Sequence, residues 1–248
     1  MFNQYLEKYA VINSIVDESP DFINEIRHNE SAIEVREEGI NSNGISSFTY
    51  YTFAELVLII LYISQITNVS AYNERVENTL ERLKLSKASN SNIILSKIIL
   101  GVIVGAIQVI IVYFVSTIFL NINWGKDLKL MIIVLISLII FSSILGVTIS
   151  FVFKDNKVAS SIINTLLIVL GFLGGAYVPI SLVKSTAITN ILCQMTPTYW
   201  VNIALLSLSS GIRTNYSIIS IIISLELSLI LLVICIISIN LRAGDKIV

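Results

Sequence analysis

Charged residues, proline and cysteine are all scarce in this sequence. Of its 248 residues only 13% are charged while 55% are hydrophobic, and the mean hydropathy is +0.84. Soluble domains carry about twice that share of charged residues, so the composition indicates an integral membrane protein. Two cysteines cannot define a disulfide framework. We expect Cys193, in a loop, and Cys235, in an apolar run, to be packed thiols.

Signatures of catalysis and of metal binding are also missing. Lys126 follows Gly125, but the upstream glycine and the following Ser/Thr of a phosphate-binding loop are absent, so the chain should not hydrolyse ATP. The single histidine, His28, has no Cys or His cluster around it, which argues against a metal site and against a Ser–His hydrolase in the membrane. No aspartate lies inside an apolar run, and there is no basic nucleic-acid footprint. We therefore predict a protein without catalytic or cofactor-binding residues of its own.

Residues 1–50 are acidic and lack the basic start and long apolar core of a signal peptide. Residues 2–16 have helical spacing, residues 31–38 alternate like a strand, and residues 41–47 read as a turn or linker. A segment of this size buries little core. We predict a small mixed α/β soluble segment that is the remnant of a larger outer domain.

Five apolar runs follow, each near or above the roughly 20 residues that cross a bilayer. They are residues 51–69, 93–120, 130–153, 158–178 and 217–241. The fold class predicted for residues 51–248 is an all-α membrane domain. Because the second run exceeds one crossing, its first turns, with Lys97, should project from the membrane. Two apolar stretches within 179–215 are too short to cross and predict an outer re-entrant hairpin, with Tyr199 and Trp200 as a headgroup-level anchor.

Lysines and arginines predict the orientation of these spans. If the loops 71–92 and 154–157 and the C-terminal tail face the cytoplasm, that side holds nine basic residues, Lys97 included, against four outside. The N-terminal segment is then extracellular and the C-terminus cytoplasmic, in a multi-pass protein of a bacterial plasma membrane. An acidic N-terminus would have to be translocated without a signal sequence. Either this segment inserts with its N-terminus outside, or a first membrane helix that would normally precede it is missing from the chain; we favour the second.

The segment 73–86 is charged and helix-patterned within this apolar region. Val76, Leu80 and Leu83 recur at i, i+4 and i+7, and Asn73 is a candidate N-cap. The pattern predicts an amphipathic helix at a membrane surface or against a soluble partner, with a solvated loop as the alternative. The charged residues of its other faces are Glu74, Arg75, Glu77, Glu81, Arg82 and Lys84.

Two blocks of residues resemble a known family. Glu74-Arg75, then Asn-Thr-Leu-Glu-Arg-Leu at 78–83 and Ile-Ile-Leu-Ser-Lys at 93–97, are similar to the E-R, G-T-x-E-x-L and I-x-x-x-K signature of type 2 ATP-binding-cassette (ABC) permeases. Downstream, Gly-Phe-Leu-Gly-Gly at 171–175 and Pro-Thr-Tyr-Trp at 197–200 resemble the family's fifth helix, outer hairpin and entry to the sixth helix. The resemblance covers about residues 47–240, with Asn78 in place of the usual glycine and Lys87 in place of the usual proline.

The resemblance implies one half of an exporter, in which two permeases, identical or different, each sit on a cytoplasmic ATPase that holds ATP and Mg²⁺. The substrates implied are amphipathic drugs, peptide antibiotics or lipid-like molecules. The segment 73–86 would be the coupling helix, and its ATPase-coupling residues would be Glu74, Arg75, Val76, Thr79, Leu80, Glu81, Arg82 and Leu83. The residues matched to the re-entrant hairpin are Gly171, Gly175, Pro179, Pro197, Tyr199 and Trp200.

Polar residues inside the apolar runs are the remaining candidates for the substrate path or a helix seam. They are Glu226, Glu55, Gln108 and Asn164. A carboxylate such as Glu226 costs about 2.5–3.5 kcal/mol at mid-span. It can serve the substrate path, pair at a dimer seam, or bond a neighbouring helix. Two other functions stay open: a self-contained ion-coupled carrier that uses Glu226, and a non-transporting immunity or assembly factor.

Overall fold

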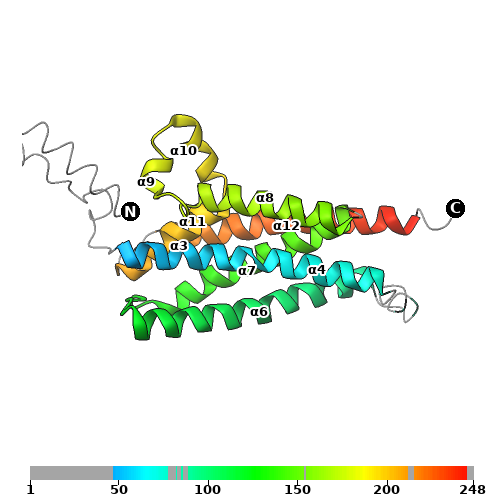
Figure 1. Ribbon diagram of the computed structural model, residues 1–248, viewed down its shortest axis with the longest axis horizontal. Coiled ribbons are helices and arrows are strands. Elements are labelled where there is room, and N and C mark those ends of the chain that lie inside the picture. The colour runs from blue at the N-terminus through cyan, green and yellow to red at the C-terminus, as the bar shows by residue number, and fades with distance from the viewer. Residues whose placement is uncertain are drawn as a thin grey trace, which may run out of the picture. The chain divides into compact units, whose positions relative to one another are not determined.

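The computed structural model describes residues 47–77, 82, 85, 89–153, 155–211 and 215–244. The chain divides into two units, Met1–Ser42 and Asn43–Val248, and all described residues belong to the second. The α/β segment predicted for residues 1–50 lies outside the described residues, except for its last four positions. Within the described part, every regular element is a helix (Figure 1).

Five spans are long and apolar enough to cross a membrane, as the sequence predicted. Their helices are α3 (Ser47–Leu61) with α4 (Ile63–Val76), α6 (Asn90–Phe119), α7 (Leu128–Val152), α8 (Asn156–Leu173) and α12 (Tyr216–Gly244). The first span exceeds the predicted run 51–69 at both ends, with a one-residue break at Tyr62. Its polar extension to Val76 stays helical because the side chains there find partners on α6 and α7, as shown below.

Helix α7 is the centre of the bundle and contacts α3, α4, α6, α8, α11 and α12. Small residues let its neighbours approach. A Cβ on Gly146 would lie 2.0 Å from the backbone oxygen of Ser64, and Cβ atoms on Gly101 and Gly105 of α6 would overlap Ser143 and Ile139 of α7. Close packing at such positions drives helix association in lipid, where water adds no hydrophobic force.

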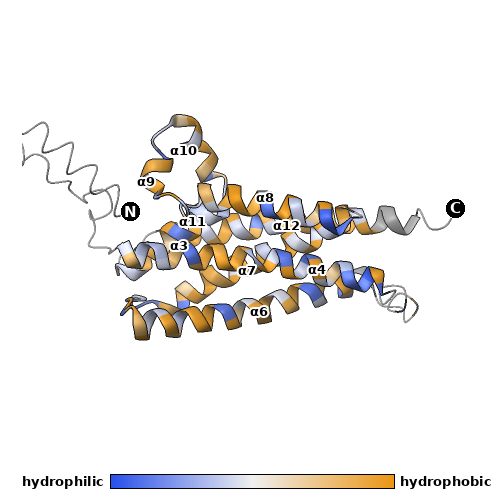
Figure 2. Cartoon of the chain, viewed as in Figure 1, coloured by the Kyte–Doolittle hydropathy of each residue, from blue (hydrophilic) through white to orange (hydrophobic). Residues whose placement is uncertain are grey.

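Helix α12 packs on α7 through small hydroxyl residues. Thr148 of α7 donates a 3.1 Å hydrogen bond to the carbonyl oxygen of Leu231. The buried residues of α12 include a stripe at three- and four-residue spacing, formed by Ser217, Ser220, Ser224 and Ser228. The opposite face of α12 is exposed and apolar, for example at Ile222 and Leu229. Apolar residues run along much of the length of the long helices (Figure 2).

Three short helices connect α8 to α12. They are α9 (Ile180–Val183), α10 (Ala187–Gln194) and α11 (Pro197–Ser209). Helices α9 and α10 project beside one end of the bundle (Figure 1). Helix α11 is bent by 83° from α10, which is the geometry of a broken span or a re-entrant loop.

The structure corrects several predictions for this connecting region. The fourth span ends at Leu173 rather than at residue 178, because Gly174 caps α8 and Gly175 takes a φ of 84°, a left-handed conformation suited to glycine. Cys193 lies in helix α10 and not in a loop. Both cysteines are free and buried, as predicted. Tyr199 is only 4% exposed, so it cannot act as a headgroup-level anchor.

Candidate functional site

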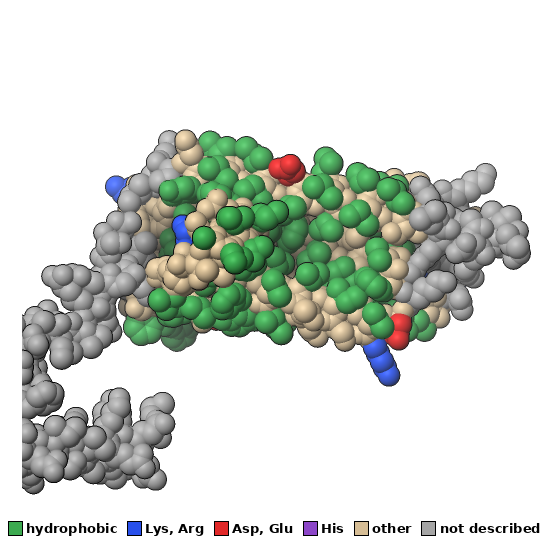
Figure 3. Space-filling model, turned by 90° about the horizontal axis from the view of Figure 1, so that it is seen from above, with side chains coloured by type: hydrophobic (Ala, Val, Ile, Leu, Met, Phe, Trp, Pro, Cys, Tyr) green, Lys and Arg blue, Asp and Glu red, His purple; other side chains and the backbone are tan. Residues whose placement is uncertain are grey.

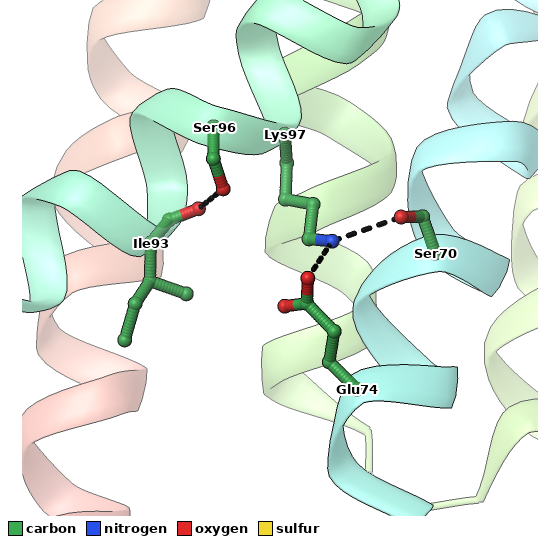
Figure 4. A network of polar contacts seen from close by, with 5 residues as sticks. All are labelled: Ser70, Glu74, Ile93, Ser96 and Lys97. Atoms are coloured by element: carbon green, nitrogen blue, oxygen red, sulfur yellow. Dashed lines mark hydrogen bonds and ion pairs between the residues drawn. The ribbon is translucent and has the colours of Figure 1, made fainter. Parts of the chain in front are cut away.

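A buried ion pair joins the ends of α4 and α6 (Figure 4). Lys97 of α6 is 5% exposed; its Nζ pairs with Oε1 of Glu74 and donates a 2.9 Å hydrogen bond to Oγ of Ser70. Glu74 and Ser70 lie four residues apart on one face of α4. Lys97 therefore points into the bundle, while the position of its turn relative to the membrane surface stays a prediction. A neighbouring carboxylate makes this inward position tolerable for a lysine.

Arg75 ties the last turn of α4 to the end of α7. Its Nη2 donates a 2.7 Å hydrogen bond to Oγ of Ser150, and its guanidinium lies 5.6 Å from the ring centroids of Tyr72 and of Phe151. Arg75 thus makes a hydrogen bond to Ser150 and also packs against two aromatic rings. Together with the Lys97–Glu74 pair, this contact joins α4, α6 and α7 where they end; we call this three-helix junction the coupling base.

The coupling base changes the interpretation of the segment 73–86. Asn73 is not an N-cap, because it lies inside α4, which continues to Val76. Thr79, Leu80, Glu81 and Leu83 lie outside the described residues, so their coupling role stays a prediction. Val76 is 59% exposed, and Arg82 and Leu85 are helical and exposed. Helix α6 begins after Ser89, whose Oγ accepts a hydrogen bond from the Asn92 amide.

Polar side chains also join α4 to α8. Gln65 Nε2 donates to Oδ1 of Asn164 at 2.8 Å and to the Ser160 carbonyl oxygen at 3.1 Å. One turn further along α4, Asn68 Nδ2 donates to Oδ1 of Asn156 at 3.1 Å and to Oγ of Ser160 at 3.2 Å. These hydrogen bonds hold the two helices together, as the helix-packing interpretation of Asn164 expects.

The outward side of α8 is nevertheless polar near this end. Asn164 is exposed although it accepts from Gln65, and Ser161 and Thr165 beside it are exposed as well. Hydrocarbon solvates such groups poorly. The described chain thus presents a polar strip, formed by Ser161, Asn164 and Thr165, where a lipid-facing helix would be apolar.

The other predicted intramembrane residues lie apart from the coupling base. Gln108 of α6 has a buried Oε1 that finds no hydrogen-bond partner within the described residues. Glu226 is exposed on α12, opposite the buried serines, and its side chain makes no hydrogen bond or ion pair within the described part of the chain. A bond from Glu226 to a neighbouring helix is therefore not found there. On the face shown in Figure 3, hydrophobic side chains cover much of the surface and charged groups are few.

The residues matched to the re-entrant hairpin meet where α8 turns toward α9. The Tyr50 hydroxyl donates to the Gly175 carbonyl oxygen at 2.9 Å and accepts from the Ile180 amide at 3.0 Å, and Asn202 Nδ2 donates to the Gly174 carbonyl oxygen at 2.9 Å. A Cβ on Gly171 would overlap Tyr177 and Leu58, so close approach requires glycine there. Sequence reasoning missed Tyr50 and Asn202; an asparagine within the short apolar stretch 200–208 was the available signal.

Three further hairpin residues hold α10 and α11. Pro197 is the first residue of α11, where proline's missing amide is harmless. Lys184 Nζ donates to the Tyr199 hydroxyl at 2.8 Å, and Trp200 Nε1 donates to the Gln194 carbonyl oxygen at 2.7 Å. Pro179 caps α9. These contacts give the bent α10–α11 pair a defined shape.

Comparison with known proteins supplies the family. A search of curated proteins and a search of solved structures each found no significant match. The family model described as "ABC-2 family transporter protein" matches residues 1–239, nearly the whole length. That match agrees with the five apolar spans and with the resemblance carried by the segments 74–97 and 171–205. The chain therefore belongs to the ABC-2 transporter family, as a membrane-spanning member.

Proposed function

We propose that this chain is the permease subunit of an ABC exporter, which moves amphipathic substrates outward with energy from ATP hydrolysis on a separate ATPase subunit. The observation that supports this most is the coupling base. The segment between α4 and α6, which carries the coupling motif, starts and ends on helices that a buried ion pair holds together.

The coupling base suits a device that transmits force. A flexible loop pushed by a partner would absorb the displacement in its own backbone. Here α4 is joined to α6 through Glu74 and Lys97 and to α7 through Arg75 and Ser150. A push on residues 77–89 would consequently move three helices as one body, which is the kind of rigid-body shift that packed helices support.

Two groups of residues would have different roles: one would contact the ATPase, and the other would transmit the movement to the helices. Residues at and after the end of α4 would contact the ATPase, with apolar anchors in a groove and charges that set the register. They are Val76, Thr79, Leu80, Glu81, Arg82 and Leu83. Residues whose side chains bond within the chain, Glu74, Arg75 and Lys97, would pass the movement on. In this arrangement the coupling base faces the cytoplasm.

The polar strip on α8 supports an assembly of two permeases. Ser161, Asn164 and Thr165 are exposed from a single chain. Asn164 accepts from Gln65 and Thr165 donates to the Ser161 carbonyl oxygen, but lipid offers no partner for the remaining donors and acceptors of the three side chains. A second permease, identical or different, would enclose the strip and give it water or substrate to bind. The path would then run between the two subunits rather than through one bundle.

The test separates ATPase binding from permease insertion. Leu80→Asp with Leu83→Asp should release the ATPase while the permease stays inserted, because a carboxylate is not tolerated in an apolar groove. The matched control is Leu182→Asp with Ile188→Asp, which changes two exposed apolar residues on α9 and α10. The control should still co-purify with the ATPase. Equal co-purification of both double variants would overturn the proposed coupling surface, and ATP-dependent transport in proteoliposomes tests the exporter itself.

A further inference from the structure

A groove of about 560 Å³ lies between α3 and α6 on the outer surface of the described bundle. Phe48, Tyr51 and Glu55 line it from α3, and Ile111, Val115 and Leu120 line it from α6. Its volume is in the range of sites for drug-sized ligands, about 300–1,000 Å³. The walls are almost wholly apolar, so the one carboxylate decides which ligand fits.

Glu55 is an exposed and uncompensated acid on this wall. Its side chain makes no hydrogen bond or ion pair within the described residues. It lies eight residues into α3, about 12 Å along the helix axis, and hence inside a span rather than beyond its end. A membrane protein rarely keeps a bare carboxylate at such a place without a function.

Aromatic rings accompany the carboxylate. Phe48 and Tyr51 precede Glu55 by seven and four residues, which places all three on one face of α3. Both rings are exposed, and both line the groove. Aromatic faces attract organic cations, and a carboxylate supplies the opposite charge. Apolar side chains of α6 complete the groove and suit the body of a hydrophobic molecule.

We propose that this groove binds amphipathic organic cations, an ammonium or similar cationic group joined to an apolar body, with Glu55 as the counter-charge. The ligand enters from the lipid, because the groove opens on the outer surface of the bundle. The inference deepens the proposed function, since it names the class of exported substrate. Binding is measured without the ATPase, so the proposed cation site and the proposed exporter function are tested separately.

The probes are two ions of the same size and opposite charge, tetraphenylphosphonium and tetraphenylborate. With the full-length permease in lipid nanodiscs, we expect saturable binding of the cation and none of the anion. Glu55→Gln should weaken binding of the cation at least about tenfold, because the ion pair between the carboxylate and the phosphonium is lost. Glu77→Gln is the control: it changes an exposed carboxylate at the other end of the first span, which does not line the groove, and should leave binding unchanged.

A second variant keeps the test decisive if Glu55→Gln fails to fold. Val115→Trp fills the groove from α6 while Glu55 remains, and should also abolish saturable binding. Equal binding of both ions, unchanged binding in Glu55→Gln or Val115→Trp, or an equal loss in Glu77→Gln would each overturn the proposal. So would a disulfide between two copies carrying Tyr51→Cys, because the groove would then be a subunit interface. Cation binding without ATP-driven export would refute the exporter and leave the site intact.

Discussion

Removing the positive charge at Lys97 is the sharpest test of the coupling base. In Lys97→Met the aliphatic stem is largely kept, while Glu74 loses the ammonium group that neutralises it. The side chains of Lys97 and Glu74 are 7% and 26% exposed. Breaking a buried pair by removing one partner costs about 3–5 kcal/mol. Because Glu74 keeps some access to solvent, we expect a loss near the lower end, about 3 kcal/mol.

The companion variants distinguish the pair from the loss of a lysine. Glu74→Gln with Lys97→Met removes both charges and should recover most of the lost free energy of unfolding, since no uncompensated charge remains. Lys129→Met, at an exposed lysine of α7, should change stability by less than about 0.5 kcal/mol.

Two assays measure the effect. Unfolding in mixed micelles gives the stability of each variant, and stimulation of the ATPase by the reconstituted permease gives the coupling. We expect Lys97→Met to lose stimulation before it loses ATPase binding. Strictly additive effects of the Glu74 and Lys97 changes, or full stimulation in Lys97→Met, would refute the idea that the pair transmits force.

Four further outcomes are expected. Arg75→Lys should lower stability by about 1–2 kcal/mol, because an ammonium cannot both reach Ser150 and stack between two rings; Arg75→Met serves as the more severe comparison in the same unfolding assay. Tyr50→Phe should cost about 1–3 kcal/mol, since the Ile180 amide and the Gly175 carbonyl lose a buried partner, and proteolysis near residues 174–180 should accelerate. Gly146→Val should prevent assembly of α4 on α7 and abolish a monodisperse chromatographic peak, whereas Ala106→Val, at an exposed position of α6, should not. Glu226→Ala should reduce transport without loss of subunit assembly; loss of assembly would make the residue structural.

Several features of the fold could be predicted from the sequence because composition alone decides them. Lengths of apolar residues near 20 predict crossings regardless of their neighbours, so the five spans were found. The break between α10 and α11 followed from stretches too short to cross. The ends of spans were less predictable. The first span runs through polar residues to Val76, since Glu74 and Arg75 bond to residues that lie 23 and 75 positions away.

In the candidate site, too, the motif could be predicted from the sequence but the contacts of its side chains could not. The E-R pair was visible as a motif, but its partners, Lys97 and Ser150, could not be named from spacing along the chain. The direction of the Lys97 side chain could not be predicted either, because only the approach of α4 to α6 turns it into the bundle. Nor could the sequence say which way Glu55 and Glu226 point.

The sequence by itself determined that the chain has five apolar runs long enough to cross a membrane and an ABC-2 signature, because hydropathy, length and motif order are local properties. Tertiary structure decided which polar groups are paired and which are left exposed. The physical reason is that a charge in an apolar medium depends on a partner within a few ångströms, and that partner comes from another helix. Packing therefore placed Lys97 and Arg75 in the coupling base and left Glu55 and Glu226 on the outer surface.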